Sequence, residues 1–286
     1  MDPRFTIRTL NTDDIGGCLS LSSSVSWNQT ENDWKLLVED PLNICLGAVS
    51  QQRVIGTATA IIYENKVAWI GMVLVDKLFR GRGISKILLS DLLDQLGSIP
   101  AVKLDATPAG QPVYGKFGFM DEYTICRMIS PGIDDFLGEK QGSLPVAIPP
   151  RALHDIIDMD CMVFGAKRDR LINSLVNANP DKSWMLEENG SVSGFALARP
   201  GRNYHQIGPV YTSCFEDARA LISRALESLN GLPVVVDIPG SKVELIKWLE
   251  ATGFVTQRSF VRMYLETNPL PGKPENQFLI CGPEFG

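Results

Sequence analysis

Residues 73–86 read Val-Leu-Val-Asp-Lys-Leu-Phe-Arg-Gly-Arg-Gly-Ile-Ser-Lys, an apolar strand that leads through a basic, glycine-containing turn into a helix. Gly81 and Gly83 carry no Cβ, so the backbone can turn sharply and approach a ligand closely. The helix presents unpaired N–H groups and the positive end of its dipole at the same place. Four basic side chains accompany the single Asp76 in this stretch. The pattern therefore predicts a site for a phosphorylated ligand.

Two other interpretations of this turn are a solvated surface loop and a fragment of an RNA-binding tail. RNA-binding tails repeat the Arg-Gly unit many times, whereas this short run stands alone between a strand and a helix. The chain also lacks the Gly-x-x-x-x-Gly-Lys-Ser/Thr and Gly-x-Gly-x-x-Gly patterns of common nucleotide-binding loops. These observations favour a phosphate-binding turn of another kind.

The turn closely resembles the acetyl-CoA pyrophosphate turn of the GNAT acetyltransferases, whose pattern Arg/Gln-x-x-Gly-x-Gly/Ala falls on Arg80, Gly83 and Ser85. Ser85 departs from the final Gly/Ala and adds a hydroxyl near the phosphates. The resemblance implies a bulge in the preceding strand that frees backbone groups for the pantetheine arm. Thr107 stands where many relatives carry an Asn. The residues implied in acetyl-CoA binding are Val73, Leu74, Val75, Arg80, Gly81, Arg82, Gly83, Ile84, Ser85, Lys86, Thr107 and Phe117.

The composition limits the class of protein. A chain of 286 residues with an ordinary globular composition has room for two domains. Its apolar runs are too short for a membrane span and no apolar signal segment is seen, so we expect a cytoplasmic protein with no membrane partner. Six cysteines without a Cys-x-x-Cys pair and only two histidines argue against disulfides, a metal site and a Ser-His-Asp triad. The net charge of −6 argues against nucleic acid as a partner.

The order of short motifs indicates an internal repeat. Residues 54–60 align with residues 192–198 at an offset of 138, and Gly118-Phe119 aligns with Gly253-Phe254 at an offset of 135. Several matches in one order at a nearly constant offset suggest duplication of one folding unit. Further pairs in the same order are Arg127-Met128 with Arg262-Met263, and Lys103-Leu104-Asp105 with Val235-Val236-Asp237.

The predicted fold class is α+β with a mixed α/β sheet. The resemblance implies two GNAT-like domains in tandem, each with a central, mostly antiparallel sheet that is splayed at a parallel strand pair and flanked by helices. We assign residues 1–132 to the first domain, 133–150 to a linker rich in Pro and Gly, 151–266 to the second domain and 267–286 to a tail. Residues 278–280 in that tail could form an edge strand. Helices are expected at 12–23, 30–39, 83–96 and 217–229, and strands at 43–50, 53–63, 66–75, 101–106 and 232–237.

The segment from Tyr114 to Phe119 resembles the family's Tyr-x-x-x-Gly-Phe motif. The resemblance implies that Tyr114 is the general acid that protonates the departing CoA thiolate. A phenol is protonated at pH 7 and can donate that proton. The alternative for a Tyr before Gly-Phe is a packed ring with a satisfied hydroxyl group.

The general base is not obvious from the sequence. Many relatives carry a Glu on the strand before the phosphate turn, but that position here is Trp69. Asp105 is the candidate, because it falls at the C-terminal end of a parallel strand, where α/β sheets place ligands. It could equally cap the turn at Thr107-Pro108. A water molecule or the more distant Asp121 and Glu122 are further options.

The acceptor substrate is expected near Trp27, Asn28 and Trp69. An aromatic and amide mixture of this kind suits an amine or amino-acid-like ligand. The pattern Thr30-x-x-Asp33 is also typical of a helix cap, which is compatible with binding.

The second half lacks the features that would make it active. Its corresponding turn, residues 211–217, reads Tyr-Thr-Ser-Cys-Phe-Glu-Asp, and its two acids would repel a pyrophosphate. Leu249 stands at the position of Tyr114. This half resembles the degenerate C-terminal unit of bacterial two-domain GNAT acetyltransferases of the YitH-like type. Arg168, Arg170 and Arg199 either bind an anionic group of the substrate or lie solvated at the surface.

The sequence thus predicts an acetyl-CoA-dependent N-acetyltransferase that moves an acetyl group to a primary amine by direct attack in a ternary complex. Acetyl-CoA is the co-substrate, no metal is expected, and the other partner is a small-molecule amine. Two alternatives are a non-enzymatic acyl-CoA-binding or partner-binding module on this scaffold and a protein lysine acetyltransferase. Oligomeric state is left open, with a homodimer as one option.

Overall fold

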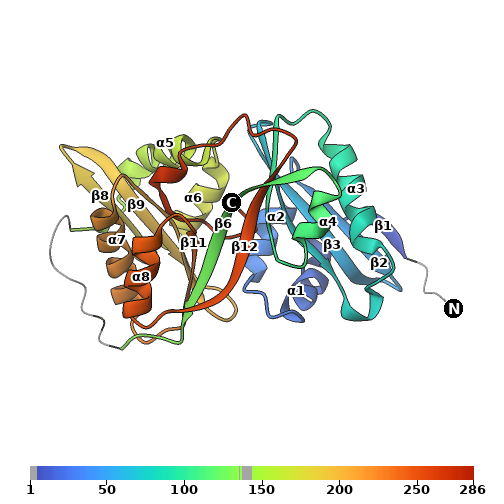
Figure 1. Cartoon of the computed structure of the whole chain (residues 1–286), viewed down its shortest axis with the longest axis horizontal. Helices are drawn as coiled ribbons and strands as arrows, with labels where there is room; N and C mark the ends of the chain where they lie inside the picture. Colours follow the sequence, from blue (N-terminus) through green and yellow to red (C-terminus); the bar gives the residue numbers. More distant parts are fainter. Residues whose placement is uncertain (1–4, 135, 137–143) are drawn as a thin grey trace.

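From residue 12 to residue 106, the first half of the chain folds in the order that its sequence predicts. The computed structural model describes residues 5–134, 136 and 144–286. The second helix begins with the expected cap, in which Thr30 Oγ1 accepts a hydrogen bond from the Asp33 N–H and Asp33 Oδ2 accepts one from the Thr30 N–H. The elements of this half, blue to green in Figure 1, are β1 (Thr6–Thr9), α1 (Ile15–Ser23), α2 (Glu31–Val38), β2 (Ile44–Ser50), β3 (Arg53–Tyr63), β4 (Val67–Val75), α3 (Ile84–Leu96), β5 (Ala101–Ala106), α4 (Gln111–Gly115) and β6 (Phe119–Ser130).

The second half repeats this order of elements. Gly118 and Gly253, paired in the sequence repeat, both adopt a left-handed conformation, with φ of +91° and +96°, just before a long strand. None of the helices in the described part of the chain has the length and apolar character needed to cross a bilayer. The elements are β7 (Val146–Ala147), α5 (Leu153–Phe164), α6 (Asp169–Ala178), β8 (Ser183–Glu188), β9 (Ser191–Arg199), β10 (His205–Thr212), α7 (Phe215–Ser228), β11 (Val234–Pro239), α8 (Val243–Ala251), β12 (Val255–Leu265) and β13 (Gln277–Leu279).

A mixed sheet of 13 strands runs through both halves, which confirms the expected fold class. Strands β4 and β5 are parallel, as predicted, but they pair only from Val67–Ala101 to Ile70–Leu104 and then diverge. Strands β10 and β11 form the equivalent parallel pair of the second half and diverge after Ile207–Val236. Each half therefore contains a splayed opening in its sheet.

The last long strand of each half is exchanged with the other half. Strand β12 pairs with β5, β6 pairs with β11, and β6 and β12 pair with each other, so that they cross the middle of the molecule together (Figure 1). Nothing in the order of the sequence motifs predicts this exchange. The boundaries at residues 132 and 150 separate the halves along the chain, but residues 119–130 complete the sheet of the second half.

Two buried ion pairs fasten the exchanged strands. Arg127 on β6 donates from Nε and Nη2 to the two carboxylate oxygens of Asp237 on β11, at 2.7 Å each. Arg262 on β12 donates in the same way to Asp105 on β5, at 2.9 and 3.0 Å. These are the Arg and Asp positions of the sequence repeat, so each half supplies the arginine for the other half's aspartate. Because each arginine donates two hydrogen bonds to the carboxylate of its aspartate, the buried charges compensate one another.

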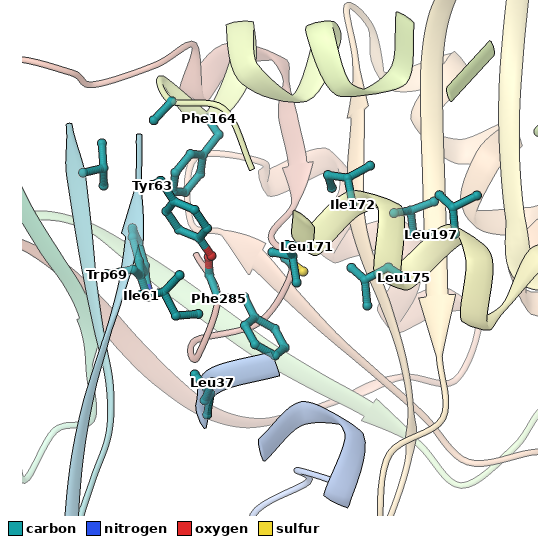
Figure 2. Close-up of a cluster of buried hydrophobic side chains, with 14 of the residues drawn as sticks. Leu37, Ile61, Tyr63, Trp69, Phe164, Leu171, Ile172, Leu175, Leu197 and Phe285 are labelled. Carbon is teal, nitrogen blue, oxygen red and sulfur yellow. The ribbon is translucent and has the colours of Figure 1, made fainter. Parts of the chain in front are cut away.

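The hydrophobic core between the halves is continuous. It joins two regions of the one sheet. In the first half, α1 and α2 cover the β3–β4 face, and in the second half, α5 and α6 cover the face of β9 and β10. Figure 2 shows Tyr63 and Trp69 of the first half beside Phe164 of α5, with Phe285 between the two halves. Separate clusters lie under α3 in the first half and under α7 and α8 in the second.

The segment 277–286 occupies the splayed opening of the second half. Strand β13 pairs with β10 at Val210–Leu279, and the Ile280 N–H donates to the Asp237 carbonyl of β11 at 3.0 Å. The fit is close, because a Cβ added at Gly208 would meet the Ile280 carbonyl oxygen. A strand thus exists close to the expected residues 278–280, as β13 at Gln277–Leu279, and it pairs with β10 inside the sheet rather than at its edge.

We expect Asp237→Asn to lower the free energy of unfolding by about 3–5 kcal/mol, because it leaves Arg127 buried beside a neutral amide. Urea unfolding followed by circular dichroism measures the loss. Asp94→Asn on the exposed side of α3 is the matched control and should change that free energy by less than about 0.5 kcal/mol. Equal stability of the two variants would show that the ion pair does not fasten the exchanged strand.

Candidate active site

A cavity of about 480 Å³ occupies the splayed opening of the first half. It extends from the turn before α3, along the free edge of β4, to the segment 277–286 of the second half. Both catalytic candidates of the sequence analysis line it, as do most of the candidate ligand-binding residues. The sequence-predicted residues in its lining are Val73, Leu74, Val75, Arg80, Gly81, Gly83, Ile84, Ser85, Asp105, Thr107, Tyr114 and Trp27.

The turn before α3 forms one end of the cavity. Gly81 and Gly83 have φ of +79° and +77°, a conformation that glycine adopts without a Cβ penalty, and Gly83 begins the helix. Asp76, the only acid of the turn, is engaged by Arg53 and by the N–H of Leu78. Arg80 lines the cavity and has no acidic partner in the described residues. This end can therefore bind an anion such as a diphosphate.

The edge of β4 forms the middle of the cavity. Thr57 of β3 pairs with Leu74 and Thr59 with Gly71, so two residues of β4 oppose one of β3, and Met72 has a φ of +50°. This is a β-bulge. It confirms the distortion that the resemblance implied. Because β5 has already diverged, residues 71–75 pair with β3 on one side and border the cavity on the other.

Tyr114 projects from α4 into the cavity near β4. Its ring packs edge-on against Phe119 at a centroid distance of 5.9 Å, and its hydroxyl has no hydrogen-bond partner among the described residues. Burial raises the pKa of Tyr114, so the hydroxyl stays protonated through the neutral range. The structure therefore does not show the satisfied hydroxyl of the alternative interpretation, and the phenol can donate its proton to a ligand.

Asp105 lines the cavity, but Arg262 binds both of its carboxylate oxygens. Burial raises the pKa of Asp105, while the adjacent Arg262 opposes that rise. A carboxylate held on both oxygens by an arginine is poorly placed to accept a proton from a substrate. The geometry therefore argues for Asp105 as the anchor of β12 and against it as a general base.

The far end of the cavity is lined by residues of both halves. Trp27 and Gln29 come from the first half, whereas Arg258, Phe260 and Glu284 come from the second. The Gln29 Oε1 and Arg258 Nε atoms are buried without a hydrogen-bond partner in the described residues. Unsatisfied buried polar atoms that face a cavity are available to a ligand.

Glu284 is the functional candidate that the sequence analysis missed. Its Oε1 accepts a hydrogen bond of 2.6 Å from Nη2 of Arg199, whose Nε donates to Asp33 at 3.1 Å. Burial raises the pKa of Glu284, and Arg199 counteracts part of the rise. Arg199 was a candidate for binding an anionic group of the substrate, but in the structure it binds the carboxylate of Glu284 instead. The glycine and proline residues around Glu284 indicate a turn, and nothing local in the sequence indicates a site.

The remaining candidates lie outside the cavity lining. Asn28 bonds to the loop at Tyr204 in the other half, and Trp69 Nε1 donates to the Pro283 carbonyl at 2.9 Å. Arg82 stacks on Phe79 at 5.1 Å, whereas Lys86 is exposed and Phe117 packs against the core under α3. Arg168 is buried against Asp160, and Arg170 pairs with Asp40 at the surface.

The fold, the glycine turn at a helix N-terminus and the bulged, splayed strand define a GNAT-type acyltransferase. A family model described as "Acetyltransferase (GNAT) family" matches residues 13–119, and one described as "Acetyltransferase (GNAT) domain" matches residues 156–279. The chain belongs to the GNAT acetyltransferases and contains two GNAT domains, as the sequence repeat predicted.

Similar proteins match the chain over both of its halves. The chain is 23% identical over 246 residues to the uncharacterized N-acetyltransferase YitH of Bacillus subtilis, which is 86% of each protein, so the expected YitH-like resemblance is confirmed. A putative acetyltransferase from Pyrococcus horikoshii has the same fold, with a TM-score of 0.80 at 22% identity over 100% of this chain and 97% of that one. A tandem GNAT protein from the clavulanic acid biosynthesis pathway gives 0.62 at 13% identity, over 93% and 99% of the two chains.

We expect Asn28→Ala to lower the free energy of unfolding by about 1–3 kcal/mol. Its side chain donates to the Tyr204 carbonyl and accepts from the N–H groups of Asn203 and Tyr204, which would lose these partners. Urea unfolding measures the effect, with Asn177→Ala on the exposed face of α6 as control. A change below about 0.5 kcal/mol would mean that Asn28 does not hold the two halves together and is free for a ligand.

Proposed function

We propose that this chain is an acetyl-CoA-dependent N-acetyltransferase with one active site, in the cavity of the first half. The observation that carries the proposal is the continuity of that cavity, which joins the anion-binding turn to the bulged edge of β4, Tyr114 and the far end. A cofactor with a diphosphate at one end and a thioester at the other matches the order in which these features lie along the cavity.

The parts of acetyl-CoA fit particular residues. The diphosphate suits the N–H groups of the turn and first helical residues at Gly83–Ser85, together with Arg80. The amide groups of the pantetheine arm suit the backbone of Val73 and Val75 on β4, at the edge from which β5 has diverged. The thioester would then lie near the bulge, with Tyr114 on one side and the far end of the cavity beyond it.

The chemistry requires a neutral amine that attacks the thioester carbonyl carbon. A backbone N–H near Val73 stabilises the negative charge that develops on the carbonyl oxygen. When the carbon–sulfur bond breaks, the Tyr114 hydroxyl protonates the leaving thiolate. The far end, covered by the loop at Trp27 and by the segment 277–286, favours a small-molecule amine as acceptor over a lysine on a folded protein.

The second half does not offer an equivalent site. Its splayed opening contains β13, and Glu216 and Asp217 lie in the first turn of α7, where they repel a diphosphate. Leu249, at the position of Tyr114, is buried in the core. These observations support one acetyl-CoA per chain.

Calorimetric titration with acetyl-CoA tests the number and place of the sites. We expect one site per chain and about 10- to 150-fold weaker binding for Arg80→Ala, which removes a charge-assisted contact to the diphosphate worth about 1.5–3 kcal/mol. Lys77→Ala is the control, because Lys77 belongs to the same turn and lies outside the cavity lining. Two sites, or equal affinities for the two variants, would contradict the proposed arrangement.

Turnover tests the role of Tyr114. We expect Tyr114→Phe to lower kcat by roughly 10²-fold with unchanged affinity for acetyl-CoA, because the thiolate loses its proton donor. Release of free thiol from acetyl-CoA in the presence of primary amines measures turnover. Tyr264→Phe on β12, outside the cavity lining, should keep full activity. Full activity of Tyr114→Phe would remove Tyr114 from the mechanism.

A further inference from the structure

We propose that Glu284, on the segment 277–286 of the second half, is the general base of the active site in the first half. This inference rests on the proposed acetyl transfer and identifies the group that accepts the proton of the acceptor amine. As the sequence already shows, β4 carries Trp69 at the position where many relatives have a Glu, so the base must come from elsewhere.

The position of Glu284 follows from contacts on both of its sides. The Trp69 indole donates to the carbonyl of Pro283, and a Cβ added at Gly71 would lie 3.3 Å from the Cα and carbonyl oxygen of Glu284. Gly71 immediately precedes the bulge at Met72. The backbone of Glu284 thus lies against the part of β4 where the thioester is expected.

Hydrogen bonds from both halves fix this segment. The hydroxyl of Tyr63, on β3, donates to the Phe285 carbonyl at 3.0 Å, and Figure 2 shows the two residues together. Arg168, beside α6, donates to the carbonyl oxygens of Phe285 and Gly286 at 3.2 and 2.8 Å. A base held in this way needs little reorganisation before it reacts.

Glu284 lies near the far end of the cavity, where the acceptor is expected, and one of its carboxylate oxygens is available to a ligand. Its Oε2 accepts no hydrogen bond from the side chain of another residue within the described part of the chain, whereas Arg199 occupies Oε1. Arg262 engages both oxygens of Asp105, and Arg127 engages both oxygens of Asp237. Asp33 is bound by Arg199 and by Thr30.

The electrostatic surroundings suit a base at neutral pH. Burial raises the pKa of the Glu284 carboxyl above its ordinary value, and Arg199 and Arg127 favour the charged form. Asp33, which shares Arg199, raises the pKa further, and the buried thiol of Cys281 also lies against Arg199. A carboxylate with a raised pKa is a stronger base and so a better proton acceptor.

The acceptor arrives at the site as an ammonium ion. The Glu284 carboxylate takes one proton from the acceptor nitrogen, and the lone pair of that nitrogen forms the bond to the carbonyl carbon of the thioester. The carbon–sulfur bond breaks with its electrons on sulfur, and Tyr114 protonates the thiolate. The amide nitrogen loses its second proton to the Tyr114 phenolate. Glu284 releases its proton to water, so one proton leaves per acetyl group transferred.

Glu284→Gln tests the assignment with two small nucleophiles, methylamine and hydroxylamine. Methylamine is an ammonium ion at pH 7 and needs the base, whereas hydroxylamine is already uncharged. We expect kcat/KM for methylamine to fall by about 10²-fold or more and kcat/KM for hydroxylamine to stay near the wild-type value. Glu250→Gln on the exposed side of α8 is the matched control and should behave as wild type.

The pH profile separates a base from a residue that only supports the fold. In wild type, kcat/KM for methylamine should level off above the pKa of Glu284, because the base accepts the ammonium proton. In Glu284→Gln it should keep rising by about tenfold per pH unit, since only the neutral amine reacts. Equal loss with both nucleophiles, or an unchanged profile, would overturn the assignment.

Two further controls keep the result interpretable. If Glu284→Gln does not fold, Glu284→Asp replaces it, because aspartate keeps the carboxylate but holds it farther from the substrate. This variant should retain the level pH profile at a lower kcat/KM, and a wild-type kcat/KM would overturn the assignment.

Wild-type protein that neither binds acetyl-CoA nor releases thiol would refute the proposed function itself. Active wild type with an equally active Glu284→Gln would refute only the role of Glu284.

Discussion

The reciprocal pairing of Arg127 with Asp237 and of Arg262 with Asp105 is the constraint on which the rest of the structure depends. Each pair joins a strand of one half to the sheet of the other, and all four side chains are buried. Separating the halves would expose two open sheet edges and leave buried charges without partners. The duplicated units therefore form one sheet and do not behave as two independent domains on a linker.

Because the two halves share one sheet, residues of both halves line the cavity. The turn, the bulged strand and Tyr114 come from the first half, but Arg258, Phe260 and Glu284 reach the cavity from β12 and the segment that follows it. The exchange carries β12 to the edge of β5, beside the splayed opening. The second half has neither the glycine turn nor a tyrosine at the position of Tyr114, yet it supplies one wall of the cavity, including the Glu284 carboxylate.

The sequence predicted what depends on local pattern. Helical periodicity, the Thr30 cap and the glycine turn each follow from neighbouring residues, and the structure places them close to the predicted positions. The exchange of β6 and β12 could not be predicted, because a repeat offset is the same whether the last strand pairs within its own half or with the other. The contact between Glu284 and the bulge joins residues about two hundred positions apart, and no periodicity encodes it. Asp105 was placed correctly at a strand end, but its partner Arg262 lies in the other half.

Strand β13 fills in the second half the space that the first half leaves open for a ligand. The same splayed opening therefore holds a cavity in the first half and the protein's own chain in the second, and that chain continues from β13 to the lining of the cavity. One feature of the duplicated fold thus leaves room for a ligand in one unit and anchors a segment of the protein in the other. Side chains that hold β13 in place, far from the cavity, thereby help to fix one of its walls.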